Sequence, residues 1–163
     1  MEAGAFGPVH VTWLDAIARI GAATLLSLAL GMERFLRRKP IDFRPFVIIA
    51  VAACALTLGM SEFGHRTTDP QLSVDATRVV SGVMTGIGFI GAGALFRERY
   101  TVYGAGSAAS IWASGAIGII SGFGFLWLAF LLTLVLVLVL GLSRPFTSDY
   151  TIRVEAAEDS DDV

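Results

Sequence analysis

The sequence predicts an all-α membrane protein, a compact bundle of about five transmembrane helices. Hydrophobic residues fill 55% of the 163 positions and only 16% are charged, whereas soluble domains usually carry about 25% charged residues. The mean hydropathy is +0.70. The stretch Arg78–Phe96 is apolar yet rich in glycine. In water each interior glycine weakens a helix by about 0.5–1 kcal/mol, but in lipid the helix is enforced and glycine lets neighbouring helices approach closely.

Hydrophobic segments give the expected spans: 13–32, 46–61, 79–96, 106–121 and 123–142. Crossing the hydrocarbon core takes about 20 residues, and about 17 suffice. The second and fourth segments are at or below that limit, so flanking residues must extend them. The last two segments are separated only by Gly122–Gly124, which must turn tightly. If it does not, 106–142 forms one long bent element and the count falls to four.

Basic residues predict the orientation of the bundle. Most of them lie after the first, third and last segments: Arg34, Arg37, Arg38, Lys39, Arg44, Arg97, Arg99, Arg144 and Arg153. Only Arg66 and Arg78 lie on the other side, and Arg19 is within the first segment. The positive-inside rule therefore places the N-terminus outside and the C-terminus in the cytoplasm, which requires an odd number of spans. We expect a transmembrane domain over 1–145 and a short acidic cytoplasmic tail over 146–163.

A polar stripe runs along the first predicted helix. Asp15, Arg19 and Glu33 fall on one face at about 100° per residue. Asp15 and Arg19 are an (i, i+4) pair of opposite charge, which lowers the cost of carrying ions in lipid. In one interpretation the stripe faces the bundle interior and contacts a cation or a partner helix. In the other, Asp15 caps the outer end and Glu33 lies among the cytoplasmic headgroups beside Arg34.

The third predicted helix has a small side and a bulky side. Glycines at 82, 86 and 93 make a stripe suited to helix packing. The bulky side is suited to lipid and consists of Val79, Val83, Ile87 and Ile90. At the outer end Asp75 is a plausible N-cap, and it projects toward the same sector as Arg78.

The fourth predicted helix carries a hydroxyl stripe. Its small residues fall on one face: Ser107, Ser110, Ser114, Gly118 and Ser121. Trp112 and Ile119 lie on the opposite side, where we expect lipid. Serines can hydrogen-bond across helices, or they can line a narrow wet path, and the pattern favours packing. The fifth segment is apolar on all faces and is expected to be the most lipid-exposed helix.

Catalytic patterns are missing from the sequence. It has no GxSxG, HExxH or Walker loop, and GIGFIGAG lies within a span, outside the strand-turn-helix context of a dinucleotide site. Cys54 is the only cysteine, and His10 and His65 are isolated. We therefore expect no enzymatic activity, no cofactor and no nucleic-acid partner, and we leave open whether a metal binds.

Three blocks, in this order, resemble the MgtC/SapB family of bacterial inner-membrane proteins. The first is Gly31–Arg34 (GMER) with Lys39-Pro40 and Arg44. The second is Asp75-x-x-Arg78 followed by Gly86–Gly93 (GIGFIGAG). The third is Ser107–Trp112 (SAASIW) followed by Ala116-Ile117-Gly118. Together they cover roughly residues 13–142.

The resemblance implies about five spans in the inner membrane, a role in adaptation to low magnesium and, in pathogens, survival inside host cells. It implies a regulator more than a transporter, with the F-type ATP synthase as a proposed target. The motifs carry over a functional core: Glu33, Arg34, Asp75, Arg78, Gly86, Gly88, Phe89, Gly91, Gly93, Ser107 and Trp112. To these the helical patterns add Asp15, Arg19 and Ser110.

The chain also departs from the family pattern. Phe35 stands where an acidic residue often follows Glu-Arg, Asp42-Phe43-Arg44-Pro45 replaces Gly-Leu-Arg-Thr, and Gly82 occupies a usually polar position. Longer members carry a cytoplasmic ACT-like domain, which we do not expect here.

The leading hypothesis is a non-enzymatic regulator that acts through the glycine and serine faces of its third and fourth helices. We expect these two faces to pack against one another, backbone against backbone, with the charged groups gathered around their contact. Through them the protein would contact another membrane protein or a second copy within the lipid. The rival is a small oligomeric magnesium, cation or proton-coupled transporter, with the polar stripe and the serine stripe lining its path. An enzyme acting on lipid would need a nucleophile–base pair that the sequence lacks.

Overall fold

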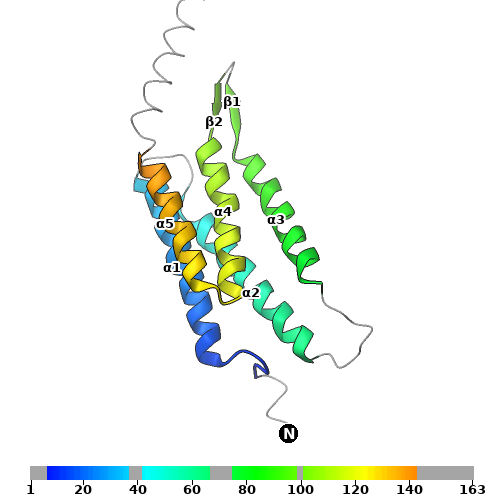
Figure 1. The fold of residues 1–163 in the computed structure, drawn as a ribbon. Helices are drawn as coiled ribbons and strands as arrows, with labels where there is room; N and C mark the ends of the chain where they lie inside the picture. Colours follow the sequence, from blue (N-terminus) through cyan, green and yellow to red (C-terminus); the bar gives the residue numbers. More distant parts are fainter. Residues whose placement is uncertain (1–6, 37–41, 67–74, 99–100, 143–163) are drawn as a thin grey trace, which may run out of the picture.

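The computed structural model describes residues 7–36, 42–66, 75–98 and 101–142, which form a helical bundle with a small hairpin at one end (Figure 1). The elements in order are α1 (Trp13–Leu36), α2 (Arg44–Arg66), α3 (Ala76–Gly93), β1 (Phe96–Glu98), β2 (Thr101–Tyr103), α4 (Ala105–Gly122) and α5 (Leu126–Leu142). The helical bundle is confirmed. The sequence reading missed the antiparallel β1–β2 pair, because it assigned Phe96 to a helix that ends at Gly93.

The turn between α4 and α5 confirms five helices, within the described residues, over the alternative of four. Gly124 has φ +87°, a left-handed conformation that favours glycine. Its N–H donates to Ser121 O at 2.9 Å, and the N–H of Phe123 donates to Ile119 O at 3.0 Å. These bonds close the C-terminus of α4, so the chain reverses there instead of continuing as one bent element.

Two helices begin with side-chain caps. Thr12 and Asp15 bond reciprocally at the start of α1, with Asp15 N donating to Thr12 Oγ1 at 3.1 Å and Thr12 Oγ1 to Asp15 Oδ2 at 2.8 Å. At α3 the predicted N-cap is confirmed, because Asp75 accepts from the N–H groups of Thr77 and Arg78. The Thr77 hydroxyl, followed by the Thr77 N–H, holds the pKa of Asp75 below its usual value.

Helix α4 is the centre of the bundle and contacts every other helix. Its glycines allow this closeness, because a Cβ at Gly118 would stand 2.2 Å from Ala50 O of α2, and one at Gly122 would stand 2.6 Å from Thr57 Cβ. The predicted small stripe of α4 is buried along its whole length. Trp112 is 49% exposed, as expected, but Ile119 is only 5% exposed, so its predicted lipid contact is wrong.

Helix α3 turns part of the side that we predicted for lipid toward the bundle, although Ile90 of that side is 51% exposed as predicted. Ile87 is buried with Phe46 and Ile111, and Val83 packs against the same cluster. A Cβ at Gly115 of α4 would stand 2.3 Å from Ile87 Cδ1, so the isoleucine fills the space above that glycine. The outward side carries the stripe of small residues, where a Cβ would meet no atom within 4 Å: Gly82, Gly86, Gly88 and Gly93. The prediction that this stripe packs against α4 is wrong.

Helices α1 and α2 are long and apolar enough to cross a bilayer, with 24 and 23 residues. Helix α5 is shorter, at 17 residues, and its buried positions are only Ala129 and Thr133. The rest of α5 is partly or fully exposed, as predicted, but α3 also has only two buried residues, Ile87 and Gly91, so α5 is not distinguished as the most exposed helix. The predicted tail, 146–163, lies outside the described residues.

Candidate functional site

Three sequence motifs meet at the end of the bundle where α1 and α3 end and α4 begins (Figure 1). We call this meeting point the motif cluster: Gly31, Glu33, Arg34, Gly91, Gly106, Ser107 and Ser110. A Cβ at Gly31 would stand 3.1 Å from Phe43 O, and one at Gly91 would stand 3.3 Å from Ala108 O. Gly31 of the first motif and Gly91 of the second are therefore the points at which neighbouring backbone comes close.

The centre of the motif cluster is a buried ion pair. Arg34 Nε donates to Glu33 Oε2 at 2.5 Å, and the two side chains are only 6% and 10% exposed. Arg34 Nη1 would lie 3.2 Å from a Cβ at Gly106, which places the guanidinium beside the first turn of α4. Glu33 is thus buried with Arg34 and does not lie among headgroups as one interpretation held.

The start of α4 explains why Arg34 needs an adjacent carboxylate. Its N-cap is Gly104, with φ +88° and no side-chain cap. A helix N-terminus carries a partial positive charge, so a buried cation beside it is unfavourable. Glu33 neutralises that cation, and the pair as a whole is uncharged. Ser107 and Ser110, in the first two turns of α4, are each only 3% exposed.

Arg19 does not form the predicted pair with Asp15. Its Nη1 donates to Gly122 O at 2.9 Å, and a Cβ at Gly124 would stand 3.0 Å from its Cζ. The last carbonyls of a helix lack intrahelical partners and carry a partial negative charge, so they attract the guanidinium. Asp15 instead caps α1 with Thr12. The buried face of α1 is accordingly offset from the predicted stripe and consists of Ala23, Ser27, Leu30, Gly31 and Arg34.

Most buried hydroxyls donate within their own helices. Ser110 donates to Gly106 O at 2.6 Å, Ser114 to Ile111 O at 2.7 Å and Ser27 to Ala23 O at 2.6 Å. Ser121 Oγ is the buried hydroxyl without a hydrogen-bond partner among the described residues. A hydroxyl that donates to its own backbone has used its single donor, so it can take part in a water chain only as an acceptor. The serine stripe therefore serves packing better than a wet path.

The remaining predicted site residues are not brought to the motif cluster. Asp75 and Arg78 form an exposed ion pair at 3.3 Å near the opposite end. Phe89 is 83% exposed on α3, on the outward side that also holds Gly86, Gly88 and Gly93. In the parts of the chain that the structure describes, no group of three or more His, Cys, Asp or Glu side chains could hold a metal ion.

The sequence did not predict a role for Glu62. Its carboxylate accepts from the backbone N–H groups of Val9 at 2.7 Å, His10 at 3.0 Å and Val11 at 2.6 Å. It fastens the segment before α1 to the end of α2. The only signal in the sequence was an acidic residue directly after an apolar run.

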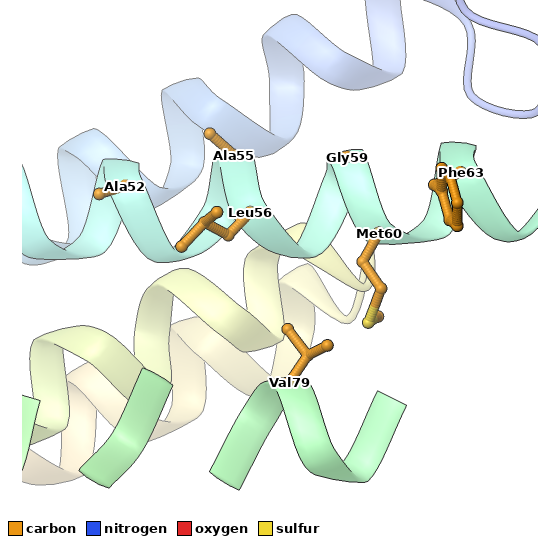
Figure 2. A pocket seen from close by; sticks show the side chains of 7 residues that line it. All are labelled: Ala52, Ala55, Leu56, Gly59, Met60, Phe63 and Val79. Atoms are coloured by element: carbon orange, nitrogen blue, oxygen red, sulfur yellow. The ribbon is translucent and has the colours of Figure 1, made fainter. Parts of the chain in front are cut away.

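An apolar groove of about 770 Å³ lies between α2 and α3 (Figure 2). Met60 of α2 and Val79 of α3 point toward one another across it. Its other lining residues are Ala52, Ala55, Leu56, Gly59 and Phe63. The groove adjoins α3 on the side of its first turns, away from the motif cluster.

Comparison with known proteins identifies relatives over most of the chain. The profile of the MgtC family matches residues 20–148. Protein SapB of Bacillus subtilis is 33% identical over 113 residues, 68% of this chain and 49% of that protein. Protein MgtC of Brucella abortus is 33% identical over 128 residues, 78% of this chain and 51% of the relative. The putative magnesium transporter YhiD of Escherichia coli is 34% identical over 112 residues, 68% and 52% of the two chains.

The chain spans about half the length of these relatives. No solved structure matches it. The similarity, together with two helices long enough to cross a bilayer, indicates a membrane protein.

Proposed function

Because this chain belongs to the MgtC family, we propose that it is a non-enzymatic regulatory protein of the bacterial inner membrane, linked to adaptation to low magnesium. We further propose that it crosses the membrane five times with its N-terminus outside. Helices α3 and α4 have 18 residues each, about 27 Å at 1.5 Å per residue, close to the thickness of the hydrocarbon core. Arg34 and Arg44 lie at one end of the bundle, which supports that end as the cytoplasmic one.

The observation that carries the regulatory proposal is the outward glycine face of α3. A Cβ added at Gly82, Gly86 or Gly93 would meet no atom of another element within 4 Å, although glycine in a membrane helix typically marks close contact with another helix. The serine face of α4 is already used inside the bundle, so of the two small-residue faces that of α3 remains available for a partner. We propose that a helix of another membrane protein packs there, and a membrane subunit of the F-type ATP synthase is the first partner to test.

A photo-reactive side chain at Gly86 is expected to crosslink to a partner helix in native membranes under magnesium limitation. The matched control is the same probe at Val135, which is 53% exposed on α5. Mass spectrometry of the adducts should find a synthase subunit, or a second copy of this chain, only with the Gly86 probe. Equal labelling at both positions, or adducts with lipid alone, would contradict a docking role for α3.

A magnesium transporter is the second candidate, favoured by the name of the YhiD relative. If it is correct, purified protein in liposomes will carry magnesium inward, and Glu33→Gln or Asp15→Asn will abolish the flux. Asp15 is exposed and bonded to Thr12, so Asp15→Asn separates a role in transport from a role in the fold. Well-folded protein that gives no flux above empty liposomes would rule this function out.

A further inference from the structure

The segment before α1 is fastened across the end of α2. We call residues 7–12 the strap. Three successive backbone N–H groups, those of Val9, His10 and Val11, donate to the single carboxylate of Glu62. Arg66, one helical turn later, donates to Gly7 O. Each contact joins positions more than 50 residues apart in sequence, so the strap is held by α2 and not by its own local structure.

The strap also covers apolar surface. Val11 is 4% exposed and belongs to a buried cluster with Ala23 of α1 and with Cys54 and Leu58 of α2. This cluster closes the α1–α2 interface at the end opposite the motif cluster. Removing Val11 from it would expose that interface, so the strap is a structural closure and not a loose terminus.

A pair of stacked histidines lies beside the strap's hydrogen bonds. The rings of His10, on the strap, and His65, on α2, have centroids 3.6 Å apart and an interplanar angle of 7°. Both residues are exposed and therefore open to solvent protons. His65 Nδ1 lies 2.8 Å from Ser61 O, which holds this ring against α2, whereas His10 belongs to the strap.

The described charges near the pair leave no net negative charge to offset two protonated rings. On α2 the described neighbours are Glu62 and Arg66, whose charges cancel, and at the start of α1 Asp15 is engaged by Thr12. Glu62 lies beside the backbone of His10, but its charge is already balanced by that of Arg66. A second proton would place two cations face to face at the stacking distance, where their repulsion is greatest. Imidazole is the side chain that ordinarily gains its charge between about pH 8 and pH 5.

We propose that the strap is a pH-sensitive latch, closed when the stacked pair of His10 and His65 holds at most one proton and released when both rings are charged. Release separates the strap's amides from Glu62 and lifts Val11 out of its cluster. The latch itself does not depend on the orientation proposed above; that orientation decides only which compartment's pH is sensed. With the N-terminus outside, that compartment is the external one.

Hydrogen exchange of the strap's amides tests the latch directly. Release breaks the hydrogen bonds that the amides of residues 9–11 donate to Glu62, so these amides should lose their protection. The full-length protein in detergent or nanodiscs is measured at about pH 7.5 and about pH 5, with rates divided by the intrinsic exchange rate at each pH. We expect the protection of residues 9–11 to fall about tenfold or more at the lower pH. Unchanged protection of the α4 amides at both pH values would show that the fold is intact.

The control variants separate histidine charge from other effects of pH. His65→Phe keeps a ring for His10 to stack on but cannot be protonated, so its strap should stay protected at both pH values. His10→Phe should behave in the same way if His65→Phe fails to fold. Glu62→Gln should lower protection at both pH values. Wild-type protein that keeps its protection, or phenylalanine variants that lose it in parallel with the wild type, would overturn the proposal.

Discussion

Replacing Gly118 by valine is expected to destabilise the bundle strongly. A Cβ at this position would stand 2.2 Å from Ala50 O and 2.9 Å from Ala50 Cα. These are backbone atoms of α2, so no rotation of a side chain can relieve the clash. The two helices would have to separate along the central contact of the bundle. Overpacking typically costs about 1–3 kcal/mol and more where the backbone must move, against a total stability of only about 5–15 kcal/mol.

The matched control is Gly86→Ala, in an outward position of α3 where no atom lies within 4 Å. Alanine favours the helix by up to about 1 kcal/mol over glycine, so this variant should be as stable as the wild type or more so. Both variants can be compared by size-exclusion chromatography of fluorescent fusions and by thermal unfolding in detergent. Equal stability of the two variants would mean that α2 and α4 are not in contact at Ala50.

Features governed by local signals could be predicted from the sequence. Hydropathy separates the five helices, and the tight turn at Gly122–Gly124 follows from glycine content between two apolar runs. Asp75 precedes an apolar helix in the position of an N-cap, and its side chain reaches only two or three residues ahead. The small face of α4 repeats with a helical period. In each case the sequence neighbours contain the determining interaction.

Features governed by distant partners could not be predicted. Whether α3 buries its glycines or its bulky side depends on Gly115 of α4, which leaves room for Ile87. Periodicity shows that the two sides differ but not which one finds a complementary surface. Arg19 was paired with Asp15 because they are four residues apart, yet its acceptor at Gly122 is 103 positions away. The backbone groups that donate to Glu62 lie 51 to 53 positions away, so its sequence neighbours did not mark it as their acceptor.

Arg34→Met is expected to destabilise the protein strongly, because it leaves a buried acid beside the space where the guanidinium was. The two side chains are 6% and 10% exposed and joined at 2.5 Å. Removing one member of such a pair costs about 3–5 kcal/mol, whereas replacing both by neutral groups is often tolerated. The double variant Glu33→Gln/Arg34→Met should therefore be more stable than Arg34→Met alone. Thermal unfolding in detergent, followed by tryptophan fluorescence, measures the order of the three proteins.

Arg78→Met is the control variant: it removes an arginine from an exposed ion pair instead of a buried one. Arg78 is also ion-paired to an acid, but its side chain is 87% exposed, and exposed pairs contribute little to stability. It should unfold close to the wild-type temperature. If Arg34→Met were equally mild, the burial of the Glu33–Arg34 pair would not matter to the fold. If instead the double variant folds but no longer crosslinks through Gly86, the charges of the motif cluster act on the partner surface of α3 and not only on the packing of α1 against α4.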